Sequence, residues 1–320
     1  MEFRFIVSPA RGVKGCSFPS EYNGHRTRIL HLVPRWLVIL CPFYGTDGLS
    51  QIGYIQPDGS GYTCLTCDIP HGNGIGYLSA LPDQKSIFFG SQDSSREVAA
   101  DLPGAAVRPQ ILECSPSVLD CQTATILPVS IPQLDHDITV LQAREPRISP
   151  DGRHYLVTAV RTDGFIILLG DLSRTNTTYT VDNLRVLNPS SQCPPRTSDD
   201  WVNRLAWYEA KAFFNGNTVL YASTRGEGFN FDDWSLDLET GESTRLTRCL
   251  EWDEDIALDP SGQYYLIGSA RQFHNQLRSL SAMKLPPFLD YALTGLSSYS
   301  ILGTNTGRLH LLEKWIIPKG

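Results

Sequence analysis

A repeated unit in the sequence carries, four residues before its turn, side chains that can exchange protons or donate hydrogen bonds. That position holds Tyr77, Glu145, Glu209 and Asp255. The position two residues further holds Ser79, Arg147, Lys211 and Ala257. Because strand side chains alternate with period 2, the two positions are expected to share one face of each strand. The pattern predicts a ring of three acids above two bases.

This predicted ring could perform general acid/base chemistry. Carboxylates crowded in a partly dry funnel have their pKa values pushed apart, so that one of them can donate a proton near neutrality. Glu145, Glu209 and Asp255 are therefore the candidate catalytic residues. An alternative stays open, in which Glu145 with Arg147 and Glu209 with Lys211 form structural ion pairs or lie on solvated strand ends.

Aromatic and polar residues near the same positions predict a pocket for a flat, apolar small molecule. The candidate substrate-binding residues are Tyr77, Arg147, Lys211, Trp207, Tyr208, Trp252 and His71. For the aromatic residues the alternative is plain packing between sheets.

The turns themselves indicate how these residues are positioned. The clearest unit, Arg144–Ala159, contains Ser149-Pro150-Asp151-Gly152 followed by a β-rich run. Three weaker copies have turns that begin at Leu81, Phe213 and Asp259. Proline presets φ and glycine tolerates φ above zero, so each unit is expected to form a hairpin.

A second repeat corresponds to the outer half of a sheet. Gly53–Thr66 and Trp234–Thr247 both read as a strand, a glycine turn and a strand that ends in Leu-Thr. Repeats of this size predict an all-β propeller with six four-stranded blades around a central channel, less than a tenth of it helical. We expect one domain over residues 1–320, with C-terminal strands from 298–303 and the N-terminal region completing the ring. Residues 1–40 fit the repeat poorly, which leaves a truncated or misjoined N-terminus open.

Composition excludes several function classes. The formal net charge is −7, and the sequence has no basic run interleaved with aromatic residues, so nucleic acid is not an expected partner. The sequence also lacks the roughly 20 consecutive apolar residues of a membrane helix, and no secretory signal is visible. We expect small-molecule substrates as partners, whereas the sequence leaves localisation and oligomeric state open.

Cysteines and histidines give no metal signature. The sequence predicts that Cys64 and Cys67 are buried thiols or a local disulfide, and that Cys114 and Cys121 can bridge a hairpin loop. The cysteine content is compatible with either a reducing or an oxidising compartment. Zinc would need a second pair of ligands, and the histidines have no HxH or HExxH spacing. We therefore expect neither a metal nor a cofactor.

With its Ser-Pro-Asp-Gly turn and outer Leu-Thr strands, the chain resembles the TolB-like, WD40-like β-propeller repeat family over residues 50–270. With Cys64-Leu65-Thr66-Cys67 on an outer strand, it is similar to a fungal subgroup that includes the hetero-Diels-Alderases of tropolone-sesquiterpenoid biosynthesis and, more distantly, saponin hydrolases. The resemblance implies an enzyme of fungal meroterpenoid metabolism that joins a quinone methide to a humulene-type terpene.

Two other functions remain open from the sequence. A glycoside hydrolase would use two carboxylates about 5 to 10 Å apart, with Glu145, Glu209 and Asp255 as the candidates. A propeller without enzymatic activity would bind proteins at its rim.

Overall fold

The computed structural model describes a subset of the chain, and every regular element in that subset is a β-strand. The described residues are 38–45, 48–56, 58–91, 108–132, 140–161, 164–188, 208–224, 232–248, 253–258, 264–269 and 313–318. Their strands are β1 (Ile39–Tyr44), β2 (Ser50–Ile55), β3 (Thr63–Cys64), β4 (Gly76–Ala80), β5 (Ser86–Ser91), β6 (Arg108–Pro116), β7 (Cys121–Ser130), β8 (Val140–Ile148), β9 (His154–Arg161), β10 (Gly164–Arg174), β11 (Tyr179–Val186), β12 (Tyr208–Asn215), β13 (Thr218–Ser223), β14 (Asp232–Asp237), β15 (Ser243–Arg245), β16 (Asp253–Leu258), β17 (Tyr264–Ser269) and β18 (Glu313–Pro318).

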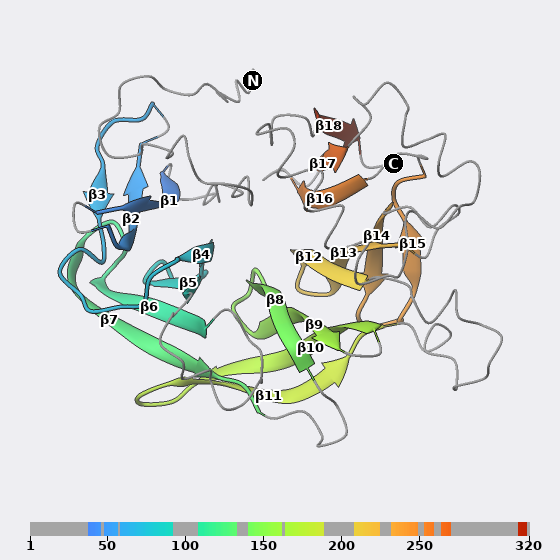
Figure 1. Ribbon diagram of the computed structural model, residues 1–320, viewed down its shortest axis with the longest axis horizontal. Coiled ribbons are helices and arrows are strands. Elements are labelled where there is room, and N and C mark those ends of the chain that lie inside the picture. The colour runs from blue at the N-terminus through green and yellow to red at the C-terminus, as the bar shows by residue number, and fades with distance from the viewer. Residues whose placement is uncertain are drawn as a thin grey trace.

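Within these residues the strands form five antiparallel units around a common centre, which makes the fold a β-propeller (Figure 1). In sequence order the units are β1–β3, β4–β7, β8–β11, β12–β15 and β16–β18. The strands β4, β8, β12 and β16 contact one another in that order, so they are the innermost strands of successive blades, and β1 contacts β4 at the start of this series.

The hydrophobic core is divided among the seams between neighbouring blades. One cluster joins β1–β3 to β4–β7 through residues such as Ile52 and Phe89. A second joins β4–β7 to β8–β11, a third joins β8–β11 to β12–β15, and a fourth joins β12–β15 to β16–β18. Among the described residues, the second, third and fourth blades therefore each bury one face against the blade before and the other against the blade after.

The second and third blades are also connected through their backbones. The outermost strands β7 and β11 pair in parallel at Tyr179↔Val129 and Thr180↔Ser130, which makes β4–β11 one eight-stranded sheet. Thr178 Oγ1 donates a hydrogen bond of 2.8 Å to Pro128 O beside this pairing.

The predicted turns form with local side-chain support. In the turn between β8 and β9, Ser149 Oγ accepts the N–H groups of Arg153 and His154, and Gly152 adopts a φ of 75°. Asp151 Oδ1 also accepts the N–H of Arg153, and between β4 and β5 the equivalent Asp83 Oδ1 accepts the N–H groups of Lys85 and Ser86. The turn aspartate therefore plays the same part in both copies, and Ser149 adds a second acceptor in one of them.

The Leu-Thr repeat also has a structural basis. Thr66 Oγ1 accepts the N–H of Ile52 on β2, and Thr247 Oγ1 accepts the N–H of Asp233 on β14, both at 2.9 Å. In the β8–β11 blade, Asn188 Oδ1 accepts the N–H of Ile167 in the same way, at 2.7 Å. We call this arrangement the strand cap. The sequence predicted its two threonine copies as a repeat but not the asparagine version.

The described residues account for five of the six predicted blades. The strand β18 pairs with β17 and so belongs to the fifth unit. The predicted strands near residues 298–303 lie outside the described residues, as do residues 1–37, so the six-bladed count stays a prediction.

Candidate functional site

The innermost strands carry bulges at the repeat position for which the candidate catalytic residues were predicted. The pairing of β4 with β5 shifts between Gly76 and Ser79, and that of β8 with β9 shifts between Arg144 and Arg147. Tyr77 and Glu145 lie inside these bulges with positive φ values of 58° and 56°. Non-glycine residues pay about 1 to 3 kcal/mol for such backbone conformations, which cluster at functional sites.

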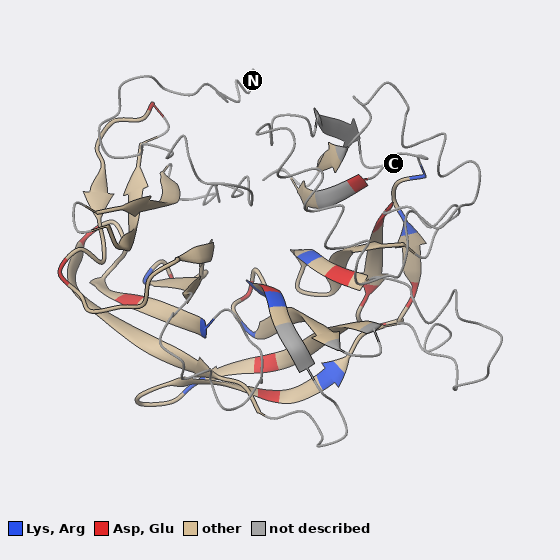
Figure 2. Ribbon diagram, in the orientation of Figure 1, with Lys and Arg blue, Asp and Glu red and all other residues tan. Residues whose placement is uncertain are grey.

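The two neighbouring strands β8 and β12 bring five charged side chains together, which we call the inner charge cluster: Arg144, Glu145, Arg147, Glu209 and Lys211. Lys211 Nζ lies 2.9 Å from Glu209 Oε2 and 3.6 Å from Glu145 Oε2. Arg144 Nη2 lies 2.6 Å from Glu209 Oε1, and Arg147 Nη2 lies 3.2 Å from Glu145 Oε2. Figure 2 shows charged residues on both strands.

Burial divides this cluster into a closed part and a part that reaches solvent. The side chains of Glu209 and Lys211 are each 1% exposed, whereas those of Glu145 and Arg147 are 10% and 17% exposed. Three cations surround two carboxylates, so the cluster carries a net positive charge. The solvent-reaching part therefore consists of Arg147, Arg144 and Glu145, with Arg144 12% exposed, and the closed part is the pair of Glu209 and Lys211.

Arg147 links three parts of the site. Its Nε donates to Lys211 O on β12 at 2.8 Å, and its Nη1 donates to Pro146 O at 3.1 Å. Its guanidinium lies 5.4 Å from the centroid of the Tyr77 ring, within the range of a cation–π contact. The predicted residues Tyr77, Arg147 and Lys211 thus lie around Glu145.

The predicted layering of acids above bases assumed a regular alternation of side chains, and the strands do not keep it. In β12 the bulge lies at Lys211, between Ala210 and Ala212, whereas Glu209 pairs regularly with Ala222. These bulges interrupt the period-2 alternation on which the layering depended. The acids and bases instead contact one another as ion pairs, including Glu145 with Arg147 and Glu209 with Lys211, and Arg144, which the sequence did not single out, forms the shortest contact of the cluster.

The remaining predicted residues are distributed differently. Tyr208 is 3% exposed and packs in the core between the β8–β11 and β12–β15 blades. Asp255 lies on β16, but its side chain is outside the described part of the structure. Trp207 and Trp252 also lie outside the described residues.

His71 lies in the first blade rather than in the inner charge cluster. Its Nδ1 is 2.6 Å from Ile69 O, and its Nε2 is 2.6 Å from Ser50 O. It borders an open groove of about 500 Å³, lined by Leu49, Gln51, Cys67, Asp68, Ile69, Pro70 and His71.

A second charged group, missed by the sequence analysis, lies at the strand cap of the fourth blade. We call it the aspartate cluster, and its members are Asp232, Asp233, Asp253, Arg245 and Thr247. The three aspartates are 0% exposed. Arg245 Nη2 lies 2.6 Å from Asp232 Oδ2, and Arg245 Nε donates to Thr247 O at 3.0 Å.

Burial raises the pKa of Asp232 to about 7, against the opposing effect of Arg245, and the charge of Asp253 adds to the increase. A carboxyl group that titrates near neutrality is a candidate proton donor. The aspartate cluster shares a blade with part of the inner charge cluster, because Glu209 and Asp233 both pair with Ala222 on the intervening strand β13.

Within the described residues, no group of three or more His, Cys, Asp or Glu side chains is arranged to hold a metal ion. The same residues include no helix that is long and apolar enough to cross a membrane.

No protein-family model matches the sequence, and comparison with curated proteins finds no match. Similar solved structures include TolB from Acinetobacter baumannii, at 16% identity and a TM-score of 0.44, covering 72% of this chain and 46% of that one. A putative TolB from Agrobacterium tumefaciens has 16% identity and a TM-score of 0.40, covering 67% and 59%. An oligogalacturonate lyase in complex with manganese has 11% identity and a TM-score of 0.42, covering 74% and 57%.

This chain therefore spans about half the length of those proteins. Identities and TM-scores this low assign no activity to it. The propeller fold rests instead on the strand pairing and on the cores between blades described above.

Proposed function

We propose that this protein is a small-molecule enzyme of the hetero-Diels-Alderase type, which joins a tropolone-derived quinone methide to a humulene-type sesquiterpene in fungal secondary metabolism. The observation that supports it best is the inner charge cluster, where three cations, one buried and two partly exposed, outnumber two carboxylates beside an aromatic ring. An oxygen-rich, electron-poor partner suits such a site, because cationic donors stabilise negative charge that develops on its oxygen atoms.

In this proposal Arg147 is the residue that contacts the substrate. It is the most exposed cation of the cluster for which contacts are described, and Tyr77 supplies a flat surface next to it. Its guanidinium would donate to the carbonyl oxygen of the quinone methide, which lowers the electron density of the heterodiene. The alkene of the terpene then adds, forming one C–C and one C–O bond with no leaving group.

Formation of the quinone methide requires the loss of water from an alcohol precursor. One group protonates the departing hydroxyl, while another removes a proton from the ring hydroxyl. Glu145 is the partly exposed carboxylate suited to accept that proton. Holding both partners in a reactive pose can lower the activation free energy by about 7 to 11 kcal/mol when the geometry is ideal.

The test is incubation of the purified protein with a tropolone alcohol precursor and humulene, with and without a chelator. We expect faster adduct formation, and a loss of about 100- to 1,000-fold in rate for Arg147→Met. Arg174→Met is the matched control, because Arg174 pairs with Glu113 on an outer, exposed part of the sheet. A wild-type protein that does not accelerate the reaction would disprove this function, and inhibition by the chelator would contradict a metal-free site.

A glycoside hydrolase is the second candidate, because two carboxylates lie close to one another. Glu145 Oε2 and Glu209 Oε2 lie 3.6 and 2.9 Å from the same Lys211 Nζ, and a glycoside hydrolase needs such a pair of neighbouring carboxyl groups. The 1% exposure of the Glu209 side chain argues against direct contact with a sugar. Sugar release from a saponin, lost in Glu145→Gln, would favour the hydrolase over the cycloaddition.

A further inference from the structure

The hairpin that ends the first blade contains a disulfide with one exposed partner. Cys64 and Cys67 are bonded, as are Cys114 and Cys121, so the described residues confirm both bridges that the sequence left open. Cys67 is exposed and Cys64 is half-buried, whereas Cys114 is 3% exposed in the core between the first two blades and its partner Cys121 is half-buried. The two disulfides therefore differ in their access to solvent.

The surroundings of Cys64 favour its departure as a thiolate. The backbone N–H of Cys67 donates to Cys64 Sγ at 2.9 Å. A hydrogen bond to a charged acceptor is stronger than one to a neutral acceptor, so this contact strengthens when the sulfur becomes anionic. In thiol–disulfide exchange, a better stabilised leaving thiolate leaves faster.

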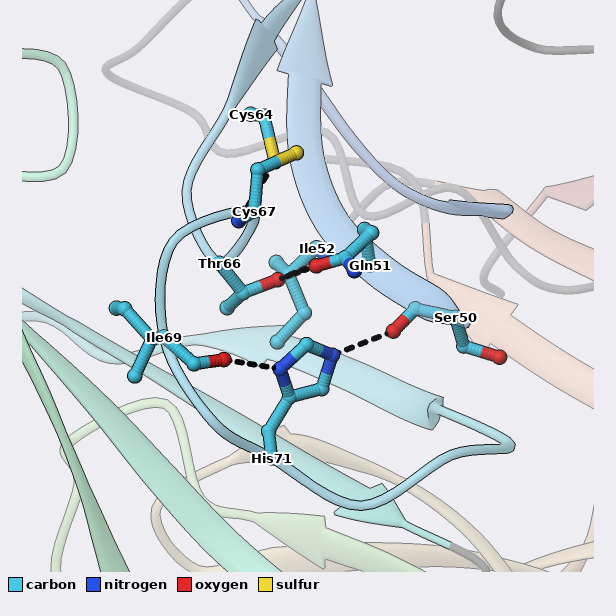
Figure 3. The surroundings of a disulfide bond; sticks show 8 residues. All are labelled: Ser50, Gln51, Ile52, Cys64, Thr66, Cys67, Ile69 and His71. Carbon is cyan, nitrogen blue, oxygen red and sulfur yellow. Dashed lines mark hydrogen bonds between the residues drawn. A yellow bond between two sulfur atoms is a disulfide. The ribbon is translucent and has the colours of Figure 1, made fainter. Parts of the chain in front are cut away.

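A space for the attacking thiol lies beside the same bond. Cys67 lines the open groove of about 500 Å³ together with Gln51, Asp68 and His71. Figure 3 shows the disulfide at one end of this region and His71 at the other. The groove is open to solvent, and the exposed carboxylate of Asp68 can accept hydrogen bonds from a peptide-like ligand there, whereas Gln51 is buried and accepts from Thr66 Oγ1.

We propose that Cys64–Cys67 is an exchangeable disulfide that reacts with low-molecular-weight thiols of the glutathione type bound in this groove. The incoming thiolate attacks Cys67 Sγ, which forms a mixed disulfide and releases the Cys64 thiolate. A second thiolate then attacks the sulfur of the bound thiol, which releases the small-molecule disulfide and the Cys67 thiolate. Two thiols are oxidised and one protein disulfide is reduced, so no further redox partner is needed.

Exchange is coupled to the blade through Thr66, which lies between the two cysteines. Thr66 Oγ1 accepts the Ile52 N–H and donates to Gln51 Oε1 at 2.8 Å. The segment after Cys67 leads to His71, which contacts Ser50 O on the same strand β2. Opening the bridge removes the covalent link between the residues on either side of Leu65 and Thr66. We therefore expect reduction to loosen the outer edge of the first blade.

The experiment treats the oxidised full-length protein with reduced glutathione, blocks free thiols with iodoacetamide and locates the modified cysteines by peptide mass spectrometry. We expect loss of the Cys64–Cys67 bridge while Cys114–Cys121 remains closed, with glutathione attached to Cys67. Opening of both bridges together, opening of Cys114–Cys121 first, or glutathione attached to Cys64 would each overturn the proposal.

Hydrogen exchange of the Ile52 amide tests the coupling to the cap. We expect this amide to lose protection in the reduced wild type and in the double variant Cys64→Ser with Cys67→Ser. The matched double variant at Cys114 and Cys121 should leave it unchanged. Unaltered protection of Ile52 after reduction would contradict the coupling, and the glutathione experiment does not depend on either variant.

Discussion

The first and fourth blades carry the same strand cap, at β2 and at β14, but surround it with different chemistry. In the first blade, Thr66 contacts Ile52 and Gln51, so the cap is neutral. In the fourth blade, Thr247 contacts Asp233 and Asp232 at the equivalent positions. The neutral copy demonstrates that the cap itself requires no carboxylate. The buried acids of the fourth blade are therefore additions to a structural device that works without them.

The largest effect should come from the most buried charges of the fourth blade. Glu209→Gln removes a carboxylate that contacts Lys211 and Arg144, which leaves buried cations with less compensation. We expect a loss of about 3 to 5 kcal/mol in the free energy of unfolding, measured by chemical denaturation. The double variant with Lys211→Met should recover part of this loss. A single variant as stable as the wild type would indicate that the charges are not part of the folded blade.

The pH dependence of stability should reveal the aspartate cluster. Because the pKa of Asp232 is raised to about 7 by burial, the folded state holds its proton more tightly than the unfolded state does. This contribution is fully present below the unfolded pKa, near 4, and is lost as the pH rises through 7.

Asp232→Asn should remove that loss, so its stability relative to the wild type should rise between pH 4 and pH 7 by a few kcal/mol. The measurement is a series of denaturation curves for both proteins across this range. Gln51→Asn, at the neutral position of the first blade, is the control and should leave the pH dependence unchanged. Parallel curves for Asp232→Asn and the wild type would contradict the raised pKa.

The strand caps themselves should be equivalent in their backbone role. Thr66→Val and Thr247→Val each leave a buried N–H without its acceptor, at a cost of about 1 to 3 kcal/mol. We expect the two losses to be similar, with the Thr247 variant somewhat worse because Asp232 also loses a hydrogen-bond donor. Thermal unfolding of both variants measures this. A cost confined to one blade would break the equivalence of the two caps.

The smallest effect is expected at an exposed ion pair outside this comparison. Arg174 contacts both carboxylate oxygens of Glu113, but its side chain is 48% exposed. Arg174→Met should therefore change stability by no more than about 1 kcal/mol. Thermal unfolding at low and high salt should give nearly the same small difference, and a large loss would place this pair among the structural charges.

The sequence predicted the blades because their turns and outer strands carry residue types with a direct conformational role. Proline, aspartate and glycine specify the hairpin at Ser149–Gly152, and the Leu-Thr pairs specify the strand caps. The bulges at Tyr77 and Glu145 were not predictable in the same way, because neither residue is a glycine that would signal a positive φ.

The inner charge cluster was predicted in part for the same reason. Glu145, Arg147, Glu209 and Lys211 were selected from their offset to the turn, whereas Arg144 lies outside the two selected positions and next to a bulge that the sequence did not predict. The aspartate cluster was missed because the repeat alignment began at Trp234, directly after Asp233. Extending it by two residues would have placed two acids opposite Gln51 and Ile52.

The parallel pairing of β7 with β11 has a consequence for how the propeller comes apart. Most seams between blades consist of side-chain contacts, but this one adds backbone hydrogen bonds and the contacts of Glu113 with Tyr179 and Arg174. Neighbouring units that are joined more strongly tend to lose structure together. The second and third blades should therefore behave as one cooperative block, so that the ring opens first at seams on either side of it.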